Sequence, residues 1–209
     1  MPPSFEHSGL LALLHPHGQA TAVGAVSPDG GASILAFPEF LRTAGARRFF
    51  SYWDNLPKAG FAPDRKDFSP AAIAPLMPAV TILEIVSDEL IVQRLAGTAV
   101  CRAMGFDPTG GNALDLVAPE TRPHYLSLLR AQTSTPCGRW NMLRVRRENL
   151  VERAEALTLP MYHSLSEHWM ILSYFGSIET VAYEHGPYEI LAYEDTQWID
   201  LGAGVPDLV

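Results

Sequence analysis

The sequence predicts an α+β domain in which an antiparallel sheet carries helices packed on one face. Three observations predict this fold class: a strand pair at 80–95, a run of short helices followed by a longer one, and three further strand candidates between 140 and 175. Because these strands do not alternate regularly with helices, a doubly wound parallel sheet is disfavoured. Two strands before the helices and three after them give a five-stranded sheet.

The strand candidates share runs of β-branched and aromatic residues bounded by turn residues. The clearest pair is 80–86 and 90–95, separated by a Ser-Asp-Glu turn. Three more follow the helices, the first two joined by a short Glu-Asn connection: 140–147, 151–159 and 169–175. Strands joined by such short turns pair with their chain neighbours, which favours the antiparallel arrangement.

Two helices are predicted between the strand groups. Residues 97–105 change to helical spacing, with Met104 on the apolar side and a glycine past the end. A longer helix runs from 119 through 132, with a proline in its first turn and Tyr125 on its apolar face. These helices are expected to cover the sheet.

The N-terminal third divides into two parts. Residues 1–36 are rich in Gly, Ala, Ser and Pro, which favours a loosely attached, partly disordered arm over the alternative of a small hairpin. Residues 37–60 predict an amphipathic helix with large apolar groups at three- and four-residue steps, among them Phe40, Phe49, Tyr52 and Trp53. This aromatic stripe needs cover, either from its own domain or from a second copy of the chain. We assign these four residues to a dimer or partner surface and expect a homodimer.

Composition bounds the class of protein. The chain has 209 residues, 15 Lys+Arg against 23 Asp+Glu, a net charge of −8 and 47% hydrophobic residues, so one globular domain with extensions is expected. The negative charge argues against a nucleic-acid binder, and no apolar stretch reaches the ~20 residues of a membrane span. Two cysteines exclude a disulfide scaffold and favour a reducing, cytoplasmic location.

The order of elements resembles that of a PAS domain, a ligand-sensing and partner-binding module. Spaced local sequences agree and resemble the PAS-like family found mostly in alphaproteobacteria: 52–53, 63–68, 73–78, 94–98, 105–110 and 155–160. The resemblance covers residues 47–177 and implies a PAS-like five-stranded fold with a cavity between sheet and helices. The domain core is placed at 61–177. A C-terminal segment, 178–209, follows it, and its residues 198–204 also resemble the ending of that family.

Cofactor chemistry finds little support in the sequence. The cysteine motif of photoactive flavin PAS domains is absent, and the resemblance to haem sensors rests on one helix residue, His124, for which an exposed position is favoured. His163 and His168 lack a convincing third ligand, so no metal is expected. No nucleophile elbow or phosphate loop is present, which favours a non-enzymatic protein.

Six residues are proposed as ligand-binding: Arg65, Arg94, Met104, His124, Tyr125 and Glu155. Arg94 and Glu155 fall inside otherwise apolar strands, so they are expected to take part in a structural ion pair, face solvent, or bind a ligand. The sharper hypothesis is that Arg94 or Arg65 holds the carboxylate of a small acid in the cavity.

One basic concentration lies in the strand pair 140–159, where Arg144 and Arg146 should share a face. A solvated strand face is the simpler interpretation, and a docking surface for an acidic protein partner is the functional alternative. Arg139, Arg147 and Arg153 belong to the same concentration.

The sequence therefore predicts a non-enzymatic sensory or regulatory module that binds a small ligand, a protein partner, or both. Two alternatives stay open: an enzyme on a similar cone-shaped α+β fold acting on a small apolar substrate, and a pure interaction scaffold whose core is filled. Apolar side chains that line a cavity and those that fill a core look identical in sequence.

Overall fold

The computed structural model describes residues 38–147, 149–186 and 188–207. The predicted arm at 1–36 lies outside these residues. No helix within the described part has the length and apolar character that crossing a membrane requires.

A six-stranded antiparallel sheet forms the centre of the molecule, with strand order β4-β3-β7-β6-β5-β8. The predicted α+β class and antiparallel pairing are confirmed. The strands are β3 (Val80–Ile85), β4 (Ile91–Ala96), β5 (Cys137–Arg147), β6 (Leu150–His163), β7 (His168–Tyr183) and β8 (Glu189–Asp200). The predicted strand number was wrong by one, because the sheet has a sixth strand, β8.

Strand β8 comes from the segment that was assigned to a C-terminal extension. It pairs with β5 from Arg146↔Glu189 to Cys137↔Asp200. The predicted boundary at residue 177 falls inside β7. Only Ile190, Trp198 and Ile199 are buried in β8, and such an edge strand lacks the strict apolar alternation by which a strand is recognised in sequence.

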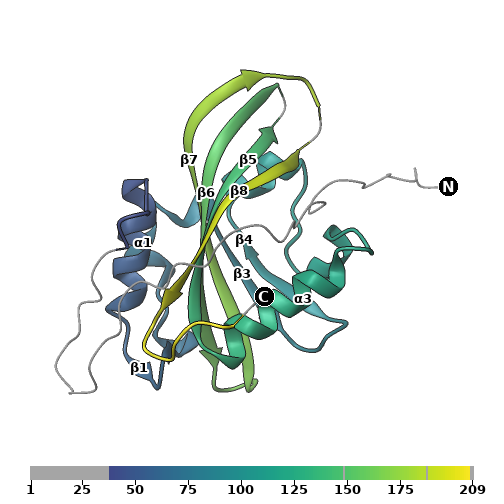
Figure 1. Ribbon diagram of the computed structural model, residues 1–209. Helices are drawn as coiled ribbons and strands as arrows, with labels where there is room; N and C mark the ends of the chain where they lie inside the picture. Colours follow the sequence, from purple (N-terminus) through teal and green to yellow (C-terminus); the bar gives the residue numbers. More distant parts are fainter. Residues whose placement is uncertain (1–37, 148, 187, 208–209) are drawn as a thin grey trace.

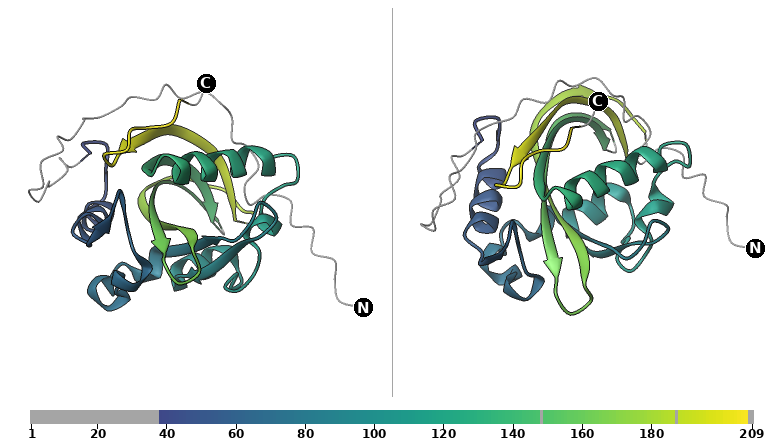
Figure 2. Two further views of the ribbon diagram at one scale, coloured as in Figure 1. Left: turned by 90° about the horizontal axis from the view of Figure 1, so that it is seen from below. Right: turned by 60° about the horizontal axis from the view of Figure 1, so that its bottom comes forward.

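Three α-helices accompany the sheet within the described residues: α1 (Ala44–Asp54), α2 (Thr98–Met104) and α3 (Arg122–Ser134). Short 3-10 turns connect them to the strands: η1 (Arg65–Asp67), η2 (Pro70–Ile73), η3 (Met77–Ala79) and η4 (Ala113–Leu116). A two-stranded sheet pairs β1 (Lys58–Ala59) with β2 (Ala62–Pro63). The large sheet is strongly curved, with α3 lying across its concave face and α1 on the opposite, outer face (Figures 1 and 2).

Helix α1 begins where Thr43 caps it, since the Thr43 hydroxyl accepts a hydrogen bond from the Ala46 backbone N–H at 3.0 Å. Its aromatic stripe packs on the outer face of the sheet, where Phe49 and Trp53 are 0% exposed. Trp53 Nε1 also donates to the Pro160 carbonyl at 2.8 Å. The domain's own sheet therefore covers Phe49 and Trp53, which corrects their assignment to a partner surface. Phe40 and Tyr52 are partly buried against the same cluster.

The two faces of the sheet pack against different elements. In β5, successive side chains point to opposite faces. Trp140 and Met142 point to the outer face, where they join the cluster beneath α1. Arg139, Asn141 and Leu143 point to the concave face, beneath the helices α2 and α3. The concave face is where the candidate site lies.

Candidate functional site

A cavity of about 150 Å³ lies between the concave face of the sheet and the elements α2, η4 and α3. A cavity of this size can hold a molecule such as benzene. Its apolar walls come from both the sheet and the helices and include Leu83, Val100, Met104, Leu129, Ile171 and Phe175. The region between sheet and helices is therefore not completely filled by side chains.

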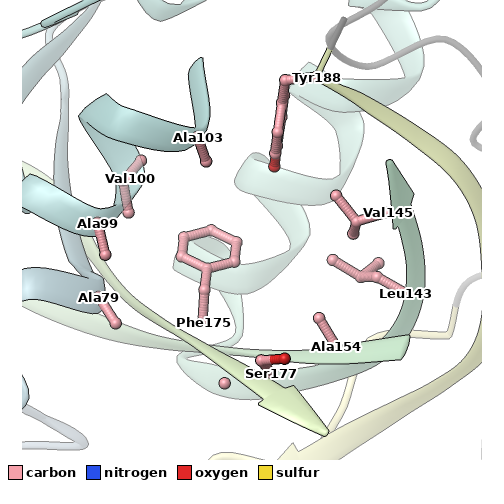
Figure 3. A pocket seen from close by; sticks show the side chains of 11 residues that line it. Ala79, Ala99, Val100, Ala103, Leu143, Val145, Ala154, Phe175, Ser177 and Tyr188 are labelled. Carbon is pink, nitrogen blue, oxygen red and sulfur yellow. The ribbon is translucent and has the colours of Figure 1, made fainter. Parts of the chain in front are cut away.

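A second pocket, of about 70 Å³, adjoins this cavity on the α2 side. Figure 3 shows it: Phe175 points into the space between α2, which carries Val100, and β5, which carries Leu143. Val100, Leu143, Phe175 and Tyr188 line both spaces. The second pocket is thus a continuation of the cavity along the strands.

Arg139 is the one charged side chain that lines the cavity within the described residues. It is 8% exposed, and its buried Nε has no hydrogen-bond partner. Burial lowers the pKa of Arg139, while the neighbouring Tyr193, Tyr125 and Cys137 act in the opposite direction. Its guanidinium lies 5.8 Å from the centre of the Trp198 ring, which supplies a cation–π contact but no counter-charge.

Uncharged polar groups stand near Arg139 in the same lining. Asn141 Oδ1 accepts from the Thr196 hydroxyl at 3.0 Å, which leaves the Nδ2 amide of Asn141 as a donor. Ser173 contributes a hydroxyl from β7 and is 4% exposed. Burial raises the pKa of Tyr125 to about 12, so this phenol stays protonated and can donate a hydrogen bond.

The structure brings two of the six predicted ligand-binding residues to the cavity, Met104 and Tyr125. His124 neighbours Tyr125 on α3 but is exposed and does not line the cavity. Arg65 and Arg94 lie together in a separate, open groove, where Glu84 is also found. These placements correct the cavity assignment of His124, Arg65 and Arg94.

Glu155 faces the other side of the sheet, which corrects its assignment to the ligand cavity. Its carboxylate is 0% exposed and accepts hydrogen bonds from the Arg42 N–H at 2.9 Å, the Thr43 N–H at 2.6 Å and Trp140 Nε1 at 2.8 Å. These donors satisfy the buried charge at the start of α1, where the helix dipole also favours a negative group. Glu155 therefore has a structural position outside the cavity.

Arg94 forms an ion pair with Glu84, whose side chain is only 2% exposed. Ser166 Oγ donates to Glu84 Oε1 at 2.8 Å, and His168 Nδ1 lies 2.9 Å from the same oxygen. Burial by itself raises the pKa of Glu84, but the hydrogen bonds from Ser166 and His168 and the adjacent Arg94 lower it to about 2. In the described part of the chain no three His, Cys, Asp or Glu side chains form a metal-binding group.

Arg144 and Arg146 share the outer face of β5, as predicted, and each is paired within the chain. Arg144 binds Glu194 at 2.6 Å, and Arg146 binds Glu184 and Glu189. A docking role for this face toward an acidic partner stays a prediction.

Arg139 is the charged cavity-lining residue that sequence analysis missed. It was grouped with the basic residues of a solvated strand face. The usable signal was strand alternation: Arg139 and Asn141 alternate with Trp140 and Met142, so the two polar residues share one face and the two apolar ones the other. Both faces turn out to be covered, and the polar pair faces the cavity.

Together, the curved antiparallel sheet and the helices over its concave face define an α+β domain with a cavity between sheet and helices. Comparison with known families agrees: a family model described as PAS domain matches residues 41–172, which is more than half of the chain. The chain therefore belongs to the PAS domain family. A search of curated proteins gave no match.

Proposed function

We propose that this PAS domain is a sensory or regulatory module that binds a small molecule in the cavity between the sheet and α2, η4 and α3. The observation that carries the proposal is the cavity itself, with mostly apolar walls and a few polar groups that converge from β5, β7 and α3. Ligand sites commonly have this composition. The unfilled space favours a ligand-binding role over a scaffold whose core is filled.

The titratable groups of the cavity favour a non-enzymatic role. Acid–base catalysis near neutral pH works best with a group whose pKa lies close to the working pH. The lining contains no Asp, Glu or His within the described residues, and burial raises the pKa of both Tyr125 and Tyr193. PAS domains generally act as sensory modules without catalysis, which agrees with this interpretation.

Native mass spectrometry of protein purified from its own host, with an absorption spectrum, tests the proposal. A matched pair of variants locates the binding site: Ala156→Leu fills the cavity, whereas Ala154→Leu fills the adjoining pocket. We expect a bound small molecule in the native protein and in A154L, and its loss in A156L. A clean ligand-free mass for the native protein would instead favour the scaffold.

Contact with a second copy of the chain is a second candidate role, and exposed side chains at the end of β7 favour it. Val181 and Tyr183 lie two residues apart on the strand and are 45% and 83% exposed. Sedimentation equilibrium of Tyr183→Ser should show less dimer than the native chain. Leu165→Ser is the control, since Leu165 is 90% exposed in the turn between β6 and β7.

A cytoplasmic location, expected from the cysteine content, stays a prediction.

A further inference from the structure

The charge of Arg139 has no partner within the cavity. The side chain is more than nine-tenths buried, its Nε has no hydrogen-bond partner, and no ion pair forms between it and a carboxylate among the described residues. A buried charge is costly unless it is paired and hydrogen-bonded. Arginine does not relieve that cost by losing its proton, because it stays charged in proteins. The site is therefore electrostatically incomplete without a further group.

The groups that face Arg139 cannot supply the missing charge. Tyr125, Tyr193 and Cys137 are titratable neighbours whose charges act on it. Arg139 also acts on His124, whose imidazole is neutral or positive and so cannot serve as a counter-charge. Burial raises the pKa of Tyr125 and of Cys137 to about 12 and raises that of Tyr193, so all three are neutral near pH 7. The counter-charge is therefore not supplied by the part of the chain that the structure describes.

We propose that the cavity binds a small organic monoanion, a carboxylate with an apolar body, whose charged end is held by the guanidinium of Arg139. This inference rests on the proposed ligand-binding function and names the ligand class. A guanidinium matches a carboxylate through two parallel hydrogen bonds, and the Nδ2 amide of Asn141 and the hydroxyl of Ser173 are further donors in the lining. One cation in the lining favours one negative charge on the ligand.

The rest of the cavity selects the body of the ligand. Leu83, Leu129 and Ile171 provide apolar walls, and the volume of about 150 Å³ suits a body of about the size of one aromatic ring. The cavity offers a polyanion, such as a sugar phosphate, neither enough space nor the additional cations that its charges would need. An aromatic or short aliphatic monocarboxylate fits both limits.

The test uses an NMR titration of the full chain with three monocarboxylates, benzoate, phenylacetate and hexanoate, each compared with its primary amide. The amide keeps the shape and removes the charge. We expect each acid to bind at least about tenfold more tightly than its amide, because hydrogen bonds to charged groups are the stronger ones. Shifted backbone signals should cluster on β5 and α3, beside the cavity.

Arg139→Met removes the charge and keeps an extended side chain, so acid and amide should then bind equally. Arg139→Gln is the second variant, and Arg153→Met is the control, because Arg153 lies in exposed ion pairs with Glu179 and Glu194. R153M should keep the native preference for the acid. Equal binding of acids and amides to the native chain, or a preference that survives in R139M or R139Q, would overturn the ligand class while leaving the ligand-binding function intact. Failure of acids and amides alike to bind the cavity would overturn both.

Discussion

The carboxylate of Glu155 accepts a hydrogen bond from the backbone N–H of Thr43 at 2.6 Å, although 112 residues separate the two in the chain. Thr43 is also the N-cap of α1, so one carboxylate in the middle of the sheet fixes the start of the helix on its outer face. The Arg42 N–H and Trp140 Nε1 complete the site. This contact joins the N-terminal helix to the PAS core.

Glu155→Gln should therefore destabilise the protein. The amide keeps the shape of the side chain but replaces charge-assisted hydrogen bonds with weaker ones and places an NH₂ group against an N–H donor. We expect a loss of about 2 kcal/mol in the free energy of unfolding, measured by urea denaturation. Glu179→Gln is the control, because its carboxylate is half exposed and its ion pair with Arg153 should matter little. Equal effects of the two substitutions would argue against the role of Glu155.

Glu84 should make the stability of the fold depend on pH in the acidic range. Its pKa falls from 4.5 to about 2 in the folded protein, so its contribution is complete above about pH 4.5 and is lost as the pH falls toward 2. The size of the shift corresponds to about 3 kcal/mol at neutral pH. The charged or titratable groups that face it are Arg94, His163 and His168.

Urea unfolding between pH 2.5 and 7 checks this prediction. The native chain should lose stability steeply below about pH 4.5, and Glu84→Gln should flatten that part of the profile while lowering stability at pH 7. Asp88→Asn serves as the control, since Asp88 is exposed and pairs with the exposed Arg130. A profile for E84Q parallel to that of the native chain would contradict the assignment.

Gly97 should not tolerate a side chain. A Cβ at this position would lie 2.2 Å from the Met77 carbonyl oxygen and 2.3 Å from that of Pro78, and both obstacles are backbone atoms. Gly97→Ala should therefore cost about 1 to 3 kcal/mol in the free energy of unfolding, as overpacking of a tight contact does. The neighbouring exposed Thr98, changed to Ala, should have little effect. Thermal unfolding of the two variants measures the difference, and an unperturbed G97A would show that η3 can move away from α2.

Phe49→Ala should lower stability without changing the oligomeric state. The ring is 0% exposed beneath α1 and stacks on Tyr174 with centroids 5.7 Å apart. Removing a buried aromatic side chain costs about 3 to 5 kcal/mol. Urea denaturation should show this loss. Sedimentation of the folded fraction at low temperature should show the same oligomeric state as that of the native chain. A reduced dimer fraction would restore the idea that this stripe contacts a second copy.

Local patterns in the sequence were enough for much of the fold. Short-range periodicity and turn residues predict the strands at 80–95, the helices around Met104 and Tyr125, and the later hairpin. The structure contains all of these elements. The same periodicity placed Met104 and Tyr125 on apolar faces, and both line the cavity. Strand β8 was missed, because an edge strand with one partner carries a weak apolar signal.

What the sequence by itself determined is the order and type of most elements, and with them the PAS class. What only the tertiary structure decided is which face of each strand is enclosed and by what. Arg139 and Glu155 show this, because both are charged residues on neighbouring strands. Arg139 faces the cavity, where its Nε has no hydrogen-bond partner, and Glu155 binds backbone N–H groups at the start of α1 on the outer face. Strand alternation separates two faces but does not name the helix that covers each, because that choice depends on contacts between residues far apart in the chain.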